Sequence, residues 1–260
     1  MAETYRLYGR MYSHKLKQAI KEPSATKIYE LGTLLEDSVG NKYRYAKTEG
    51  SSVYTSRGAW SYNYQITGHI AVPTTAAIGA SVIYGTVGAS EGIAGDGVVA
   101  LNYLRDGYVA VWHTATSVSV HRIVSNTATS GGGTIALTLA EPIKLAVTAS
   151  VETIEIMANQ YLDVRTGNSG GNHAFVGQWK SEVVTATPYG WLLTHGPTFI
   201  DPQATVGTTN HAKIGFRHDG SIDAYLDSSV FTEHMQYAGY VLSYTAAGTQ
   251  AAPFIMLDLE

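Results

Sequence analysis

A serine flanked by glycines is the residue whose surroundings most favour chemistry. Ser169 lies in the string GNSGG at residues 167–171. Its small neighbours would let backbone N–H groups face an oxyanion beside the serine hydroxyl. His69 and Asp106 precede it in the order His, Asp, Ser. These three residues define one alternative for this chain, acyl transfer by an activated serine.

The GNSGG string is similar to the nucleophile loop of chymotrypsin-like serine proteases, and the resemblance implies an all-β protease. The segment Ile66–Ile70 around His69 weighs against it, because it lacks the alanine-rich approach usual before the protease histidine. His113 is too close to Ser169 to take that role, and the total spacing is short for two barrels. GNSGG is also an ordinary loop composition in a chain with 27 glycines. We therefore expect no catalytic residue, with the protease as an alternative.

The remaining polar residues lack the spacing of cofactor sites. Four histidines of the last third form no helical i, i+4 pair of the zinc-hydrolase type: His195, His211, His218 and His234. Asp219, Asp223 and Asp227 are spaced by four residues, unlike the alternate ligands of a calcium loop, and a solvated turn face is expected there. No Gly-Lys-Ser/Thr phosphate loop occurs. We expect no metal and no cofactor.

Composition favours strands and turns. Of the 260 residues 45% are hydrophobic and 15% charged, with 18 tyrosines and no cysteine. Stability must then come from packing, hydrogen bonds and association. The start lacks the pattern of a secretory signal, and no run approaches the roughly 20 apolar residues of a membrane span. We expect a soluble, unsecreted protein with no membrane partner.

Charge is unevenly distributed along the chain. Residues 1–57 hold ten Lys/Arg against six Asp/Glu, whereas residues 58–260 hold seven against fifteen. The front is therefore about +4 and the remainder about −8. The split indicates an arm that meets an acidic partner, with a solvated imbalance as the alternative.

The N-terminal segment has the spacing of a helix. Apolar residues recur at three-to-five-residue intervals between Thr4 and Ile20, and Pro23 would end such a helix. The expectation is a short helical arm over residues 1–22. Its basic side chains are the candidate contacts with a capsid: Arg6, Arg10, Lys15 and Lys17.

Alternation of apolar and polar residues predicts strands over the rest of the chain. Residues 27–32 and 42–47 read as a hairpin around the turn 37–41, and a tight turn is expected at residues 105–108. Further strands are expected at the following segments: 98–101, 109–112, 117–124, 134–139, 151–157, 183–184, 191–194, 212–216, 240–244 and 253–257. At least ten strands and less than about 15% helix are expected.

The predicted fold class is therefore all-β, a sandwich or barrel-like body of short antiparallel strands behind the helical arm. Three segments are expected. The arm covers residues 1–22, a β domain covers 23–180, and a C-terminal β portion covers 181–260, either separate or part of the same domain.

Nucleic-acid binding is not expected. The basic residues Lys42, Arg44 and Lys47 interleave with Tyr43 and Tyr45, but the body of the chain is acidic. Packing across a hairpin explains this pattern better. Glycan binding by the tyrosines and the four tryptophans stays open, although aromatic residues on strands more often serve a core or an interface.

Several segments in order resemble capsid-associated virion proteins of tailed bacteriophages. In those proteins the β body begins with Leu-Gly-Thr, followed by an acidic turn and an aromatic-Arg-aromatic-Ala strand, and residues 31–47 resemble that segment. Residues 189–197 resemble an aromatic strand that finishes in Gly-Pro, and residues 238–242 a closing strand. Shorter matches lie between them: 106–108, 121–126, 138–143 and 159–161. GNSGG and the helical arm depart from the pattern.

The resemblance implies a decoration (cement) protein on the outside of a phage capsid. It would be non-enzymatic, made in the host cytoplasm and carried on the virion. Its partners would be the major capsid protein and further copies of itself, a homotrimer first and a dimer as the alternative. A tail, fibre or glycan-binding receptor module is the runner-up.

Overall fold

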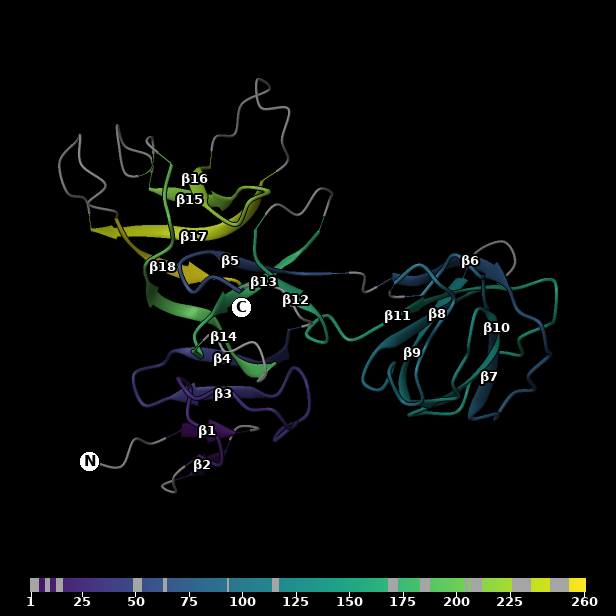
Figure 1. The fold of residues 1–260 in the computed structure, drawn as a ribbon. Coiled ribbons are helices and arrows are strands. Elements are labelled where there is room, and N and C mark those ends of the chain that lie inside the picture. Colours follow the sequence, from purple (N-terminus) through teal and green to yellow (C-terminus); the bar gives the residue numbers. More distant parts are fainter. Residues whose placement is uncertain are drawn as a thin grey trace. The chain divides into compact units, whose positions relative to one another are not determined.

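The structure is a computed structural model in which the following residues are described: 5–7, 10–12, 16–48, 53–62, 65–92, 94–113, 117–167, 173–182, 188–203, 206, 212–225, 235–243 and 253–260. They contain 18 strands, which confirms the all-β class and the expectation of at least ten strands. The strands form two curled antiparallel sheets, each a half-barrel (Figure 1).

The chain divides into two compact units. Unit 1 combines residues 1–62 with residues 161–260, and unit 2 is the continuous segment 63–160. These boundaries differ from the expected divisions after residues 22 and 180. Each unit is described by itself below.

Unit 1 holds a sheet of twelve strands, in which β16-β15-β17-β18-β14-β4-β3-β1-β2 is the path of neighbours. The strands are β1 (Tyr5–Leu7), β2 (Arg10–Tyr12), β3 (Leu34–Asp37), β4 (Lys42–Lys47), β5 (Gly58–Ser61), β12 (Val164–Arg165), β13 (Phe175–Trp179), β14 (Tyr189–Thr198), β15 (Lys213–Phe216), β16 (Ile222–Ala224), β17 (Gln236–Ser243) and β18 (Phe254–Asp258). Strand β14 is central because it pairs with β4, β13 and β18.

The expected N-terminal helix is wrong. The described residues contain no helix, and β1 pairs with both β2 and β3 to extend the sheet. Apolar and polar residues alternate within Tyr5–Leu7 and Arg10–Tyr12, which suits strands. Pairing with β3 gives hydrogen-bond partners to the backbone N–H and C=O groups of β1, whereas a short isolated helix would be only marginally stable. The opening hairpin is confirmed only in part, because its first strand is Leu34–Asp37 and not residues 27–32.

Both faces of β14 are buried in the unit 1 sheet. Along β14 the side chains of Trp191 and Leu193 belong to one buried cluster, while Leu192 belongs to another. Alternate residues of a strand point to opposite faces, so β14 connects the two clusters. Tyr45 lies against Trp191 with ring centroids 5.0 Å apart. Burial raises the pKa of the Tyr45 hydroxyl to about 12.

Unit 2 is inserted where two strands of unit 1 pair. Strand β5 pairs with β12, and the backbone N–H of Tyr62 donates to the carbonyl of Asp163 at 2.8 Å. The two ends of unit 2 also meet, because Gln65 is the register partner of Met157. An insertion whose ends are adjacent leaves the host sheet intact.

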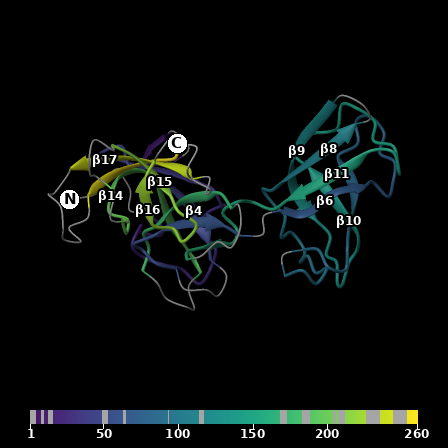
Figure 2. The same cartoon turned by 90° about the horizontal axis from the view of Figure 1, so that it is seen from above.

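Unit 2 is a sheet of six strands in the order β6-β11-β8-β9-β10-β7 (Figure 1), and Figure 2 shows β6, β11, β8 and β9 from above. The strands are β6 (Gln65–Ala71), β7 (Val82–Val87), β8 (Tyr108–His113), β9 (Ser117–Asn126), β10 (Gly133–Leu139) and β11 (Thr153–Met157). Residues 98–101 contain an isolated bridge at Val99 and no strand. The expected tight turn before β8 is present, with Asp106 at a φ of +65°.

The core of unit 2 is aliphatic. Ile83, Val111 and Ile135 have no exposed surface, and the same holds for Ile154 and Ile156. The sheet curls until β7 faces β11. A Cβ on Gly85 of β7 would lie 2.7 Å from the Ile154 Cδ1 atom, so a larger residue there would displace that side chain.

Candidate functional site

The outer face of β8 and β9 in unit 2 carries a row of exposed apolar side chains. Register pairs place Trp112 opposite Val118 and Ala110 opposite Val120, and direct partners share a face. Trp112 is 40% exposed and Val120 is 61% exposed. The outer face is defined here by five exposed residues: Tyr108, Trp112, Val118, Val120 and Val124.

Polar groups lie within and beside the outer face. Arg122, the register partner of Tyr108, lies on the same face between Val120 and Val124 and forms an ion pair with Asp106. On β11, Glu155 accepts a hydrogen bond of 2.5 Å from the Gln65 amide. Trp112, Val118 and Val120 form the apolar part of this face, and an apolar, aromatic centre beside polar groups is the usual anatomy of a protein-binding surface. Because exposed apolar side chains usually occur singly, this group indicates an interaction site.

The opposite side of the same two strands holds a pair of histidines. The Nε2 atoms of His113 and His121 each lie 3.0 Å from the Ser119 hydroxyl oxygen. Burial and then the neighbouring His113 lower the pKa of His121, so a neutral imidazole is favoured. Among the described residues no group of three or more His, Asp or Glu side chains could hold a metal ion.

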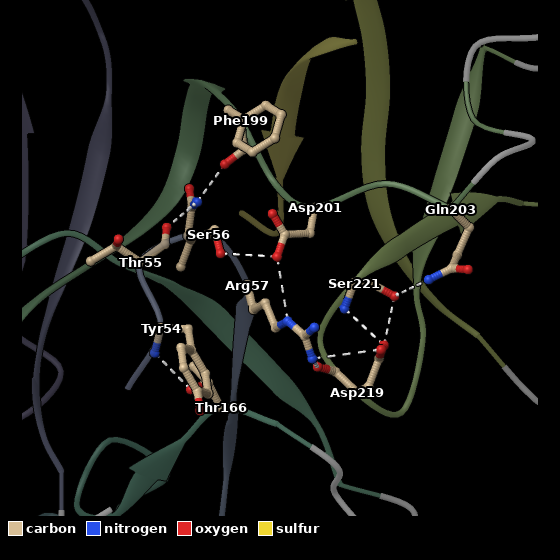
Figure 3. Close-up of polar contacts among 11 residues, drawn as sticks. Tyr54, Thr55, Ser56, Arg57, Thr166, Phe199, Asp201, Gln203, Asp219 and Ser221 are labelled. Carbon is tan, nitrogen blue, oxygen red and sulfur yellow. Dashed lines mark hydrogen bonds and ion pairs between the residues drawn. The ribbon is translucent and has the colours of Figure 1, made fainter. Parts of the chain in front are cut away.

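Unit 1 contains a polar network that links residues far apart in sequence (Figure 3). The Arg57 guanidinium lies 3.4 Å from the Asp201 carboxylate and 3.6 Å from that of Asp219. Ser56 donates to Asp201 at 3.0 Å, and the Ser221 hydroxyl donates to Asp219 at 2.6 Å. The network joins the segment before β5 to the loops beside β16.

Asp219 titrates below its ordinary range. Its burial acts to raise the pKa, but hydrogen bonds from Ser221 and the positive charge of Arg57 outweigh burial and lower the pKa overall. The carboxylate is therefore ionised at neutral pH and holds the turn. This is a structural role.

The expected solvated face at the aspartate series is wrong for Asp223. This residue is 8% exposed, and its carboxylate accepts from the Arg217 guanidinium at 3.0 Å. Asp219 faces Arg57, while Asp227 lies outside the described residues. Register places Asp223 on β16 opposite Gly215, and spacing alone could not reveal that pairing.

The serine-protease residues are not brought together in the described parts. The His69 ring lies 5.4 Å from that of Trp112, and Asp106 pairs with Arg122, the partner of Tyr108. Trp112 and Tyr108 are four residues apart, about 13 Å along the strand. His69 and Asp106 thus lie at opposite ends of β8. Ser169 is outside the described residues.

The four candidate capsid contacts are placed only in part. Arg6 lies on β1 and Arg10 on β2, but their side chains are not described, and Lys15 falls outside the described residues. Lys17 is exposed, and its backbone N–H donates to the Tyr29 hydroxyl at 3.0 Å. These residues stay candidates.

Part of the positive charge of the front is matched inside unit 1. Arg44 binds both carboxylate oxygens of Glu260 at 2.6 and 2.9 Å, which raises the arginine pKa. Arg57 faces Asp201 and Asp219. The excess of the first 57 residues is therefore only partly available to a partner. The interleaved Tyr43 and Tyr45 are buried, which confirms that packing explains the hairpin pattern.

Two of the four histidines of the last third are described. His195 lies 3.1 Å from the Asp258 carboxylate, and His218 lies beside Asp219. His211 and His234 lie outside the described residues. Among the residues that the structure covers, no helix has the length and apolarity needed to cross a membrane.

Comparisons of the chain with protein-family models, with curated proteins and with solved structures found no match. Function is therefore argued from the residues and contacts above.

Proposed function

We propose that this chain is a structural protein of a tailed-bacteriophage particle, which binds the outside of the capsid and stabilises the shell. The resemblance over residues 31–260 supports the class of partner, the major capsid protein. The observation that carries the proposal is the exposed row on β8 and β9, because a surface of this kind gains free energy when a partner removes it from water.

The geometry suggests a division of labour. Unit 2 presents the outer face on strands that are paired on both sides, and a surface that is already ordered lowers the entropic cost of binding. The binding free energy of each contact is modest, but an icosahedral shell offers many equivalent positions. Self-association of the bound chains would then increase the total affinity for the shell. The β1–β2 hairpin, with Arg6 and Arg10, would add salt-sensitive contacts at the rim.

A charge placed in the outer face tests this proposal. Val120→Asp puts a carboxylate at its centre, and Val39→Asp makes the same exchange at an 80% exposed turn residue of unit 1. The measurement is occupancy on purified capsids stripped of the protein, read by co-sedimentation. We expect Val39→Asp to bind like the unaltered chain and Val120→Asp to lose at least tenfold in affinity. Equal occupancy of both variants would contradict the outer face as the interface.

The alternative is a tail or receptor-binding module. Trp112 beside His69 is an exposed aromatic pair on which a sugar ring could stack. Co-sedimentation with purified capsids and with purified tails distinguishes the two functions. Enrichment of the chain with purified tails, and glycan binding that is lost in Trp112→Ala, would favour the alternative.

A further inference from the structure

A cavity with two lysines and a glutamate in its lining lies in unit 1. It has a volume of about 410 Å³ and lies where the segments around residues 21, 55–56, 180–182 and 198–199 meet. Its charged lining residues are Lys21, Lys180 and Glu182. The cavity plays no part in the proposed capsid contact.

A chain of hydrogen bonds orients Lys180 in this cavity. The Gln178 amide nitrogen donates to the backbone carbonyls of Thr55 and Phe199 at 2.7 and 2.6 Å, so its oxygen must accept. The Thr198 hydroxyl donates to that oxygen at 2.6 Å, and the Lys180 ammonium in turn donates to the Thr198 oxygen at 2.5 Å. An ammonium has three donors, and Thr198 accepts one of them.

The electrostatics of the cavity favour an anion. Burial, and then the like charge of Lys21, lower the pKa of Lys180 to about 8. Glu182 is exposed, as is Lys21. The nearby Asp201 carboxylate accepts from Ser56 and faces Arg57, so its charge is matched there. The two ammonium groups of Lys21 and Lys180 outnumber the one carboxylate, Glu182, so the lining has a net positive charge. The half-buried ammonium of Lys180 would be stabilised by a negative charge beside it.

We propose that this cavity binds a small oxyanion, a free phosphate, sulfate or carboxylate, between the ammonium groups of Lys180 and Lys21. Thr55 and Ser56 are neutral polar residues of the same lining. A bound anion favours the ammonium form of Lys180. Affinity is therefore highest below pH 8 and falls as the pH rises above it, because the neutral amine must then take up a proton to bind.

Calorimetric titration of the full chain with sodium phosphate, sodium sulfate or sodium acetate, at fixed ionic strength and pH 7, tests the site. The variant is Lys180→Met, and the control is Lys27→Met, which removes an exposed lysine paired with Glu30. We expect saturable one-site binding for the unaltered chain and the control, and at least tenfold weaker binding for Lys180→Met. The three salts distinguish phosphate or sulfate from a carboxylate as the preferred source of the oxyanion.

Thermal melts of the variants separate lost binding from lost folding. Replacing a half-buried ammonium with an apolar side chain should leave the free chain at least as stable. Saturable binding should raise the melting temperature of the unaltered chain and of Lys27→Met but not of Lys180→Met. Equal affinity in Lys180→Met, or no saturable binding of any of the three anions, would overturn the proposal. Neither result bears on the capsid contact.

Discussion

The two units reach a curled β fold by different routes. Unit 1 joins chain ends, so β4 near the start pairs with β14, and β14 pairs with the terminal β18. Its core is rich in aromatic rings, and ion pairs such as Arg44–Glu260 connect distant segments. Unit 2 is continuous, with an aliphatic core and an apolar row on its outside. The comparison teaches that pairing between distant segments gives unit 1 its long-range polar contacts, whereas unit 2 relies on a local aliphatic core. Exposed apolar side chains occur on both units, at β8 and β9 of unit 2 and at Tyr240, Leu242 and Phe254 of unit 1.

The largest expected effect is independent folding of unit 2. Residues 63–160 have their own core, and their ends meet at Gln65 and Met157, so the isolated segment should fold. Circular dichroism should show a β spectrum and a cooperative melt. The matching experiment replaces residues 63–160 by a short Gly/Ser linker between Tyr62 and Tyr161. An unfolded isolated segment would show that unit 2 depends on its host.

A pair of tryptophan substitutions compares the interiors of the units with their surfaces. Trp191→Ala removes a fully buried ring of unit 1 and should lower the free energy of unfolding by about 3–5 kcal/mol. Trp112→Ala removes a 40% exposed ring of unit 2 and should change it by less than about 1 kcal/mol. Urea titrations followed by circular dichroism measure both. A large loss in Trp112→Ala would mean that the outer face supports the fold.

The smallest expected effect is a difference in the acid response of the units. The lowered pKa of His121 means that the unfolded chain takes up the proton first, so stability of unit 2 falls as the pH drops through 6.5. In unit 1 the lowered pKa of His173, caused by burial, acts over the same range, and the lowered pKa of Asp219 adds a further loss of stability as the pH falls below 3.8. Unit 1 should therefore lose stability in two ranges of pH, and unit 2 in the upper range. Melts of the two separated units between pH 8 and pH 3 check this difference. A unit 1 whose stability does not fall further below pH 3.8 would contradict it.

Local pattern was enough to predict many strands. Period-two alternation predicted β4 at residues 42–47, and it predicted β8, β9 and β10 to within two residues at each end. It failed at residues 4–20, because apolar spacing cannot show that β3 offers a pairing edge. The inserted unit was also missed, since no composition change marks Tyr62 or Tyr161, and only pairing of β5 with β12 brings them together.

The candidate sites were harder to predict. Arg57, Asp201 and Asp219 lie far apart in sequence, so no motif links them, and Lys180 gains its environment from Thr198 and Gln178. The exposed row of the outer face had one signal. Val118, Val120 and Val124 recur at even positions of β9, while the alternate positions include Ser119, His121 and Ile123. Period-two alternation therefore marks one apolar face on β9, but it cannot show that this face lies outside the core, because the pairing with β8 turns Ser119 and His121 to the side of the buried Val109 and Val111.

The measurement that tests the central claim most directly is an image reconstruction of the phage particle by electron cryomicroscopy. The account predicts density for this chain on the outside of the shell, with Tyr108, Trp112 and Val120 of unit 2 against the major capsid protein. Density confined to the tail, or a capsid-bound chain whose β8 and β9 face solvent, would contradict it.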